Sequence, residues 1–270
     1  MLKKLIKPFI LPILLPILDM NYRIKKRLYF KSKMKYILTT LKEQNITDIN
    51  KFNENNWHHG YCYFTGIYKD KKVFIKVDTK LKMLKNEELF YEIMKDKIYD
   101  YLIPLEFFFE NKKLQLVCYQ FLSNYTELDE KKLFHNISYL DDIYHILNIM
   151  KEKEVIHRDI KLDNFMVHNN DIKIIDFTFS NSLKVESNFK ELDISIKENI
   201  LILKGLGIGL NPKDFHWNDS ISIIKILKIN YLENYNTYIK RFEELSYNNT
   251  YILDLKTELE NNTINEDDKN

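Results

Sequence analysis

The sequence predicts an α+β fold in which a small β-rich part with one helix precedes a larger, mostly helical part. Two observations carry this prediction. Short β-rich runs fill residues 61–122, and a single stretch with apolar residues at helical spacing interrupts them. From residue 136 onward, apolar residues recur mostly at helical spacing. We therefore expect two lobes of different make-up within one chain.

The first lobe is expected to contain two hairpins around one helix. Tyr61–Tyr68 and Lys72–Asp78 are β-rich and flank a polar turn, and Leu105–Phe109 and Leu114–Phe121 repeat this arrangement. Residues 80–99 lie between the hairpins and combine charged helix formers with apolar residues at helical spacing. This stretch is therefore expected to be an amphipathic helix.

The second lobe is expected to be mostly helical. Residues 136–153 place their apolar side chains on one helical face, and short strands are expected at 165–167 and 172–175. Beyond residue 190 the apolar runs are again typical of helices. The last residues, 258–270, are polar and acidic, and we expect them to fray.

The composition is that of a globular protein and excludes several other classes. Hydrophobic residues make up 45% of the chain, which excludes full disorder, and charged residues make up 30%, which excludes a polytopic membrane protein. Only five glycines and five prolines are present, so the chain is not collagen-like. The two cysteines, Cys62 and Cys118, lie among apolar and aromatic residues, which predicts buried free thiols in a reducing cytoplasm.

Residues 1–35 form a basic arm on an acidic body. They hold ten Lys and Arg against one acid, whereas the rest of the chain holds 31 basic and 38 acidic residues. This distribution favours contact between the arm and an anionic surface. The acidic body carries no RNA-binding motif, so no nucleic-acid partner is expected.

The arm also contains an apolar stretch, residues 9–18, which reads FILPILLPIL. Ten helical residues reach about 15 Å, half of a ~30 Å hydrocarbon core, and the prolines block a regular helix, so the stretch is not a transmembrane helix. No signal-peptide cleavage site follows it. Two interpretations stay open: an interfacial anchor on an anionic membrane, or an N-terminal segment packed on the domain. The first would make a cytoplasmic protein peripheral at the inner face of the plasma membrane.

The candidate catalytic residues lie close together in the sequence. Residues 157–164 read His-Arg-Asp-Ile-Lys-Leu-Asp-Asn and fill every fixed position of the protein-kinase catalytic loop, H-R-D-x-K-x-x-N. Asp176-Phe177 follows twelve residues after Asn164, as the metal-binding Asp-Phe-Gly does in kinases. The chain therefore resembles the protein-kinase-like superfamily. The resemblance implies a bilobal fold with N-lobe and hinge at 36–122 and C-lobe at 123–257, flanked by the arm and the tail.

The resemblance assigns roles that suit phosphoryl transfer, which depends on positioning and charge neutralisation. Asp159 would accept or orient the proton of the acceptor hydroxyl, and Lys161 would neutralise charge on the transferred phosphoryl group. Asn164 and Asp176 would supply hard oxygen ligands to Mg²⁺. Asp219, at a predicted helix start, would brace the catalytic loop, and His157 is expected to be structural.

The resemblance also implies the contacts with ATP. Val73-Phe74-Ile75-Lys76 resembles the V-A-I-K strand, so Lys76 would hold the α- and β-phosphates. Its expected partner is Glu88, with Glu92 on the same helical face as the alternative; Glu87 is expected to point elsewhere. Backbone groups of Gln120 and Leu122 would bind adenine, beside Tyr119 as the gatekeeper residue.

Several positions depart from the family pattern. The glycine-rich loop, expected at residues 60–66, keeps only Gly60 and Gly66, and Thr178 replaces the glycine of Asp-Phe-Gly, which removes backbone freedom there. No Ala-Pro-Glu is visible, and residues 210–212 are a weak candidate for it. The helical lobe is also short.

The expected function is ATP-dependent transfer of a phosphoryl group to a hydroxyl. Lys161 favours a protein Ser/Thr kinase. The short helical lobe, the degenerate glycine loop and the basic arm instead resemble bacterial cell-envelope sugar kinases, such as lipopolysaccharide core heptose kinases, and this alternative stays open. A pseudokinase that only binds nucleotide is the third interpretation.

Overall fold

The computed structural model describes residues 24–57, 60–182, 210–211, 216–217, 219–229 and 235–245. The predicted α+β class is confirmed: a five-strand antiparallel sheet with helices is followed by a region of mixed helices and strands. The chain divides into two compact units, residues 1–76 and 77–270. This division falls well before the hinge expected at residue 122. The tail at 258–270 lies outside the described residues.

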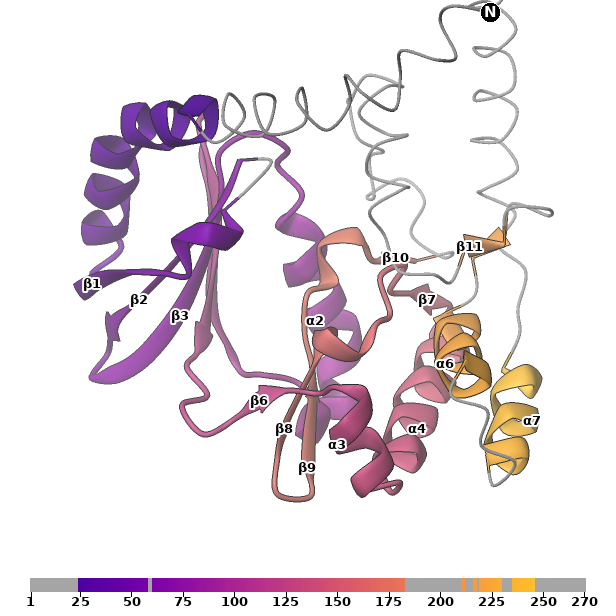
Figure 1. Ribbon diagram of the computed structural model, residues 1–270. Helices are drawn as coiled ribbons and strands as arrows, with labels where there is room; N and C mark the ends of the chain where they lie inside the picture. Colours follow the sequence, from indigo (N-terminus) through magenta and orange to yellow (C-terminus); the bar gives the residue numbers. More distant parts are fainter. Residues whose placement is uncertain are drawn as a thin grey trace, which may run out of the picture. The chain divides into compact units, whose positions relative to one another are not determined.

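The described residues of unit 1 form a helix and the first strands of the sheet (Figure 1). After the helix over residues 24–43, the elements are β1 (Thr47–Phe52), the 3-10 turn η1 (Glu54–Asn56), β2 (Tyr61–Tyr68) and β3 (Lys71–Asp78). β1 and β2 pair antiparallel. β2 and β3 are also neighbours in the sheet, which confirms the hairpin predicted for residues 61–78.

The helix over residues 24–43 was not expected from the sequence. Its buried side chains include Phe30, Ile37 and Leu41, which recur at helical spacing and cover one face. The ring of Phe30 lies 5.2 Å from the ring of Trp57, in an edge-to-face arrangement. The boundary predicted at residue 35 falls inside this helix, so the basic arm is partly a packed element of unit 1. Residues 9–18 lie outside the described part of the chain.

The glycine-rich loop predicted at residues 60–66 is wrong, because residues 61–66 belong to β2. The connection between β1 and β2 instead spans residues 53–60. Gly66 is needed for close packing: a Cβ there would lie 2.6 Å from Ile46 Cγ2 and 2.9 Å from the carbonyl oxygen of Thr47. β1 escaped prediction because its side chains are almost all exposed, so it lacks the alternation of a half-buried strand.

Unit 2 begins with the second predicted hairpin and its preceding helix. The elements are α2 (Lys85–Ile98), the 3-10 turn η2 (Tyr99–Tyr101), β4 (Leu105–Glu110) and β5 (Gln115–Gln120), and the strand order of the sheet is β1-β2-β3-β5-β4. α2 starts five residues later than expected, because the chain before it turns around a buried carboxylate. Asp78 accepts the backbone N–H groups of Lys80, Leu81 and Met83 at 2.8, 2.8 and 2.9 Å.

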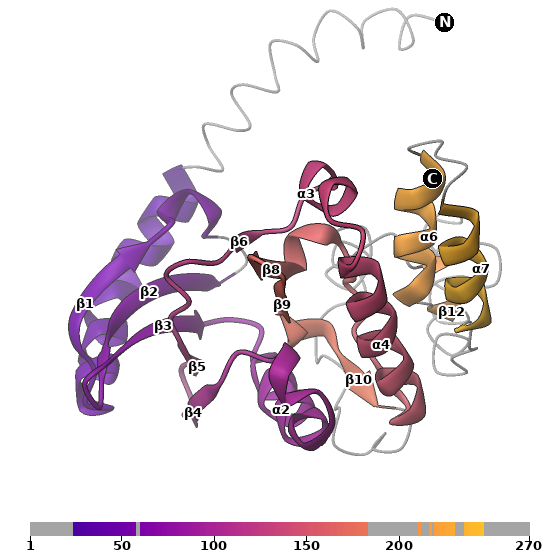
Figure 2. The ribbon, with the colours of Figure 1, turned by 90° about the horizontal axis from the view of Figure 1, so that it is seen from below.

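The remainder of unit 2 packs helices against small sheets (Figure 2). Its helices are α3 (Glu130–His135), α4 (Tyr139–Glu152), α6 (Asp219–Ile229) and α7 (Asn236–Glu244), with 3-10 turns η3 (Leu162–Asn164) and η4 (Phe177–Phe179). Its strands are β6 (Thr126–Glu127), β7 (Val155–Ile156), β8 (Phe165–His168), β9 (Asp171–Ile174), β10 (Asn181–Ser182), β11 (Leu210–Asn211) and β12 (His216–Trp217). The helix expected at 136–153 and the strands expected at 165–167 and 172–175 are thus confirmed. None of the described helices is long and apolar enough to cross a membrane.

Candidate functional site

The predicted catalytic loop connects β7 to η3 and surrounds one buried carboxylate. Asp159 is 3% exposed, and its Oδ2 lies 3.0 Å from Lys161 Nζ and accepts a hydrogen bond from Asn164 Nδ2 at 3.1 Å. Its Oδ1 is buried and has no hydrogen-bond partner among the described residues. A buried acceptor without a donor is costly, and such atoms in native proteins often mark functional sites.

Lys161 provides the positive charge of the loop. Burial alone would lower the pKa of Lys161, but the charge of Asp159 and the hydrogen bond to it outweigh that effect and raise the pKa. The side chain is 39% exposed, so the ammonium group remains accessible while it contacts Asp159. The structure therefore brings together a buried carboxylate and a charged lysine, as the sequence predicted.

Asn164 closes the loop onto Asp159. Its Nδ2 donates to the backbone oxygen of Asp159 at 2.8 Å in addition to the carboxylate. The side chain is 5% exposed, and its backbone oxygen accepts the N–H of Ile175 at 2.9 Å. Since the amide nitrogen serves Asp159, the amide oxygen is the atom that could coordinate a cation.

Asp219, the first residue of α6, binds the backbone of this loop. Its Oδ2 accepts the backbone N–H of His157 at 2.7 Å, and its Oδ1 accepts that of Arg158 at 3.0 Å. Burial raises the pKa of Asp219, and the nearby His157 and the two amide hydrogen bonds act in the opposite direction. The predicted bracing role of Asp219 is confirmed by this geometry.

His157 is a structural residue of the loop, as expected. It is fully buried, and its Nε2 lies 3.0 Å from the backbone oxygen of Ile175, while its Nδ1 accepts the N–H of Asp159 at 3.3 Å. These two contacts engage both ring nitrogens. The ring therefore links the loop to the strand end that leads to Asp176.

Asp176 lies just after β9 in a left-handed conformation, with φ 64°. Aspartate tolerates this region better than most residues. Thr178, which stands where kinases have glycine, is not among the residues with positive φ, so its side chain causes no backbone strain there. Phe177 stacks on Phe90 of α2 at 3.9 Å between ring centroids, which fixes the segment on that helix.

A buried glutamate joins this segment to β5, and it is Glu87 rather than Glu88. Glu87 is 1% exposed; its Oε2 accepts the hydroxyl of Tyr119 at 2.7 Å, and its Oε1 lies 2.6 Å from Thr178 Oγ1. Thr178 Oγ1 is also 2.8 Å from Asp176 Oδ1. The Thr178 hydroxyl has a single hydrogen, so it donates to only one of the two carboxylates at a time.

The spacing of apolar residues along α2 is a signal in the sequence that identifies Glu87 as a buried residue. Glu87 lies three, four and seven residues before Phe90, Tyr91 and Met94, the buried face of α2. Glu88 is only half-buried, and partial burial raises its pKa against the attraction of Lys85. Within unit 2, Glu87 contacts Tyr119 and Thr178, so the expectation that it points elsewhere is wrong.

Removing the Glu87 carboxylate should destabilise the protein more than removing that of Glu88. The Glu87→Ala variant leaves the buried Tyr119 hydroxyl without its acceptor, which costs about 1–3 kcal/mol of unfolding free energy. The matched Glu88→Ala variant should change it by no more than about 0.5 kcal/mol. Chemical denaturation of both variants is the measurement, and equal losses would contradict the assignment of Glu87 as the buried member.

The predicted ATP contacts are distributed over both units. Lys76 is in unit 1, is 6% exposed, and has its Nζ 5.3 Å from the ring centroid of Tyr61. In unit 2, Gln120 ends β5 with an exposed side chain and donates its N–H to the Pro104 oxygen at 3.0 Å, and Leu122 lies two residues beyond it. The roles of these three residues stay predictions.

The pairing of Lys76 with Glu88 also stays a prediction. Non-additive activity losses for Lys76→Ala and Glu88→Ala would support it, because both changes would remove one ion pair. Non-additivity between Lys76→Ala and Glu87→Ala, with additive losses for Glu88→Ala, would assign the role to Glu87 instead.

The described residues contain no group of three or more His, Cys, Asp or Glu side chains that could hold a metal ion. A groove of about 1180 Å³ lies beside α3 and the β8–β9 hairpin, and its lining includes Asp129, Lys132 and His168 but none of the predicted site residues.

Comparison of the chain with protein-family models gives no match, and comparison with curated proteins gives none either. The geometry of the loop around Asp159 is therefore the basis for any functional assignment.

Proposed function

We propose that the protein is an ATP-dependent phosphotransferase that moves the γ-phosphoryl group of ATP to a hydroxyl. The observation that supports this most directly is the loop itself: the buried Oδ1 of Asp159 has no donor among the described residues, and Lys161 Nζ lies beside Oδ2. A hydroxyl of the acceptor would donate to the Asp159 carboxylate. Lys161 would offset the negative charge of the transferred group.

The positioning contacts are consistent with this assignment. Asp159 is held at its backbone oxygen and its Oδ2 by Asn164, and the preceding backbone is held by Asp219. A catalytic base needs such support, because small displacements of the reacting group cost large factors in rate. His157 completes the support from the strand end before Asp176.

The residues present fit Mg²⁺ as the accompanying ion. The Asn164 amide oxygen and the Asp176 carboxylate are hard oxygen donors, and Mg²⁺ in nucleotide sites usually takes one or two protein ligands together with phosphate oxygens. When bound, the ion would neutralise charge on the phosphates. Lys76 and the backbone of Gln120 and Leu122 are the proposed contacts with the phosphates and the adenine.

Protein Ser or Thr is the proposed acceptor, because Lys161 is present and contacts Asp159. The sugar-kinase alternative is supported by the basic arm, which favours a membrane-linked acceptor. The decisive comparison is mass spectrometry of the phosphoproteome and of envelope glycans from cells with wild-type protein or Asp159→Asn. Loss of phosphate from only one class identifies the acceptor, and no difference in either favours the pseudokinase.

Asp176→Ala should weaken Mg²⁺-ATP binding, because it removes a carboxylate from a divalent site with few protein ligands. We expect a loss of about tenfold or more. Isothermal calorimetry should show this loss, and Asp163→Ala is the matched control, since it removes an exposed carboxylate of η3 that has no predicted metal role. Equal affinities for wild type and Asp176→Ala would contradict the metal role.

A further inference from the structure

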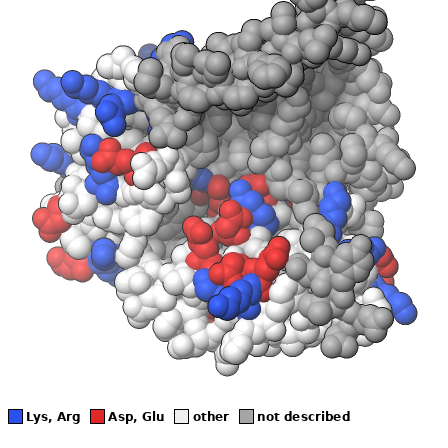
Figure 3. All heavy atoms as spheres, in the orientation of Figure 1, with Lys and Arg blue, Asp and Glu red and all other residues white. Residues whose placement is uncertain are grey.

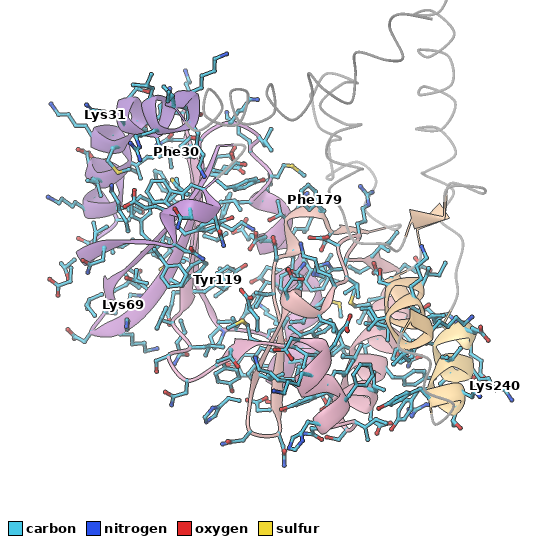
Figure 4. All side chains as sticks on the ribbon, viewed as in Figure 1. Phe30, Lys31, Lys69, Tyr119, Phe179 and Lys240 are labelled. Carbon is cyan, nitrogen blue, oxygen red and sulfur yellow. The ribbon has the colours of Figure 1, made fainter. Side chains whose placement is uncertain are left out.

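The outward face of the helix over residues 24–43 carries a stripe of exposed side chains. Ile24, Leu28, Lys31, Lys35 and Lys42 are spaced by four, three, four and seven residues, which places them on one helical face, and all are exposed. We define these five residues as the outer stripe. Phe30, Ile37 and Leu41 occupy the opposite, buried face. Figure 4 labels neighbouring Phe30 and Lys31 on this helix.

The stripe combines apolar and cationic surface. Ile24 is 50% exposed and Leu28 is 60% exposed, and they lie one helical turn apart. The helix holds seven Lys and Arg against a single acid, Glu43. Figure 3 shows Lys and Arg side chains gathered over this part of unit 1, at the upper left. Exposed apolar residues at one end of a Lys-rich face are typical of helices that lie in a membrane interface.

We propose that the outer stripe docks unit 1 on an anionic phospholipid bilayer. Ile24 and Leu28 would enter the boundary between headgroups and acyl chains, and Lys31, Lys35 and Lys42 would contact anionic headgroups. The charge of the helix is complementary to such a surface. The apolar residues 9–18, which precede the stripe in sequence, favour lipid over nucleic acid as the partner.

The buried face of the helix attaches the outer stripe to the rest of unit 1. Phe30 packs on Trp57, and Lys26 Nζ donates to the Asn55 oxygen at 2.8 Å. The docking surface is therefore part of a folded unit rather than a flexible tether. For this reason deletion of residues 1–35 is not a valid test, because it removes Phe30 together with the stripe.

The test uses the full chain and vesicles of phosphatidylcholine, with or without about a quarter of phosphatidylglycerol. We expect the wild type to sediment with the anionic vesicles only. The variant with Lys31→Gln, Lys35→Gln and Lys42→Gln should lose roughly a hundredfold in partitioning. Ile24→Ser with Leu28→Ser should lose roughly tenfold. Melting temperatures of both variants should equal that of the wild type, since all five side chains are exposed.

The matched control removes three positive charges from unit 2, at the exposed residues Lys97, Lys112 and Lys131. This variant should bind as the wild type does, within about twofold, because it leaves the outer stripe intact. Equal losses in the control and the stripe variants would overturn the proposal, as would no binding by the wild type or equal binding to neutral vesicles. Binding to a structured RNA that is stronger than binding to vesicles, and that the stripe variants abolish, would also overturn it. The result does not depend on kinase activity.

Discussion

The Asp159→Asn variant should lose phosphoryl transfer by about 10²–10⁴ in rate while it still binds Mg²⁺-ATP. The substitution keeps the shape of the side chain, but an amide does not accept the proton of the acceptor hydroxyl. The contact with Lys161 at 3.0 Å would also lose its charge, so the ammonium group would be less firmly placed. Both effects act on the chemical step, so we expect the loss in kcat.

Single-turnover assays with purified full-length protein, together with calorimetric titration of Mg²⁺-ATP, measure the two parts of this prediction. Asp163→Asn is the matched control, because it makes the same chemical change at an exposed carboxylate four residues away. It should keep wild-type rates. If Asp159→Asn turned over within a few-fold of the wild type, the carboxylate would not be the base. If it failed to bind nucleotide, the loss of activity would report a disturbed site instead.

The contacts of the loop at residues 157–164 could be predicted because the residues that make them are close in the sequence. Asp159, Lys161 and Asn164 lie within six residues, and a short loop that brings them together needs no information about distant elements. Asp219 lies sixty residues beyond Asp159, and only the resemblance to protein kinases suggested its bracing role. The hydrogen bonds from His157 and Arg158 bear this out.

The choice between Glu87 and Glu88 depends on which face of α2 is buried, because adjacent residues of a helix differ by about 100° in direction. The spacing of the buried Phe90, Tyr91 and Met94 brings Glu87 inward. The helix start expected near residue 80 is too early, since the local turn around Asp78 delays it to Lys85.

The edge strand β1 and the helix over residues 24–43 were missed for opposite reasons. β1 has almost no buried side chains and is held by its backbone pairing with β2. The helix has an apolar face formed by Phe30, Ile37 and Leu41, but seven Lys and Arg between residues 24 and 43 make net charge the stronger signal in the sequence. The boundary at residue 35 marks the end of the most basic stretch and not the end of the helix.

Phe30→Ala should lower the unfolding free energy of unit 1 by about 3–5 kcal/mol, the usual loss for a buried phenylalanine. Phe30 is 5% exposed and packs edge-to-face on Trp57, which in turn lies 5.5 Å from the ring of Phe64. Removal of the ring would open a cavity between the helix and the β1–β2 connection. Deletion of residues 1–35 should destabilise unit 1 at least as much, because it removes Phe30 together with the first half of the helix.

Trp57 supplies a local probe, because the chain has only two tryptophans and the Trp217→Phe background leaves Trp57 alone. Urea titration followed by Trp57 fluorescence should therefore show an earlier midpoint for Phe30→Ala. The matched control is Leu28→Ala on the same helix, whose side chain is 60% exposed and whose removal should change the free energy by no more than about 0.5 kcal/mol. Unchanged midpoints for both Phe30→Ala and the deletion would mean that the helix contributes nothing to the stability of unit 1. A shift confined to Phe30→Ala and the deletion would establish the helix as core, with only its outer stripe available to a membrane.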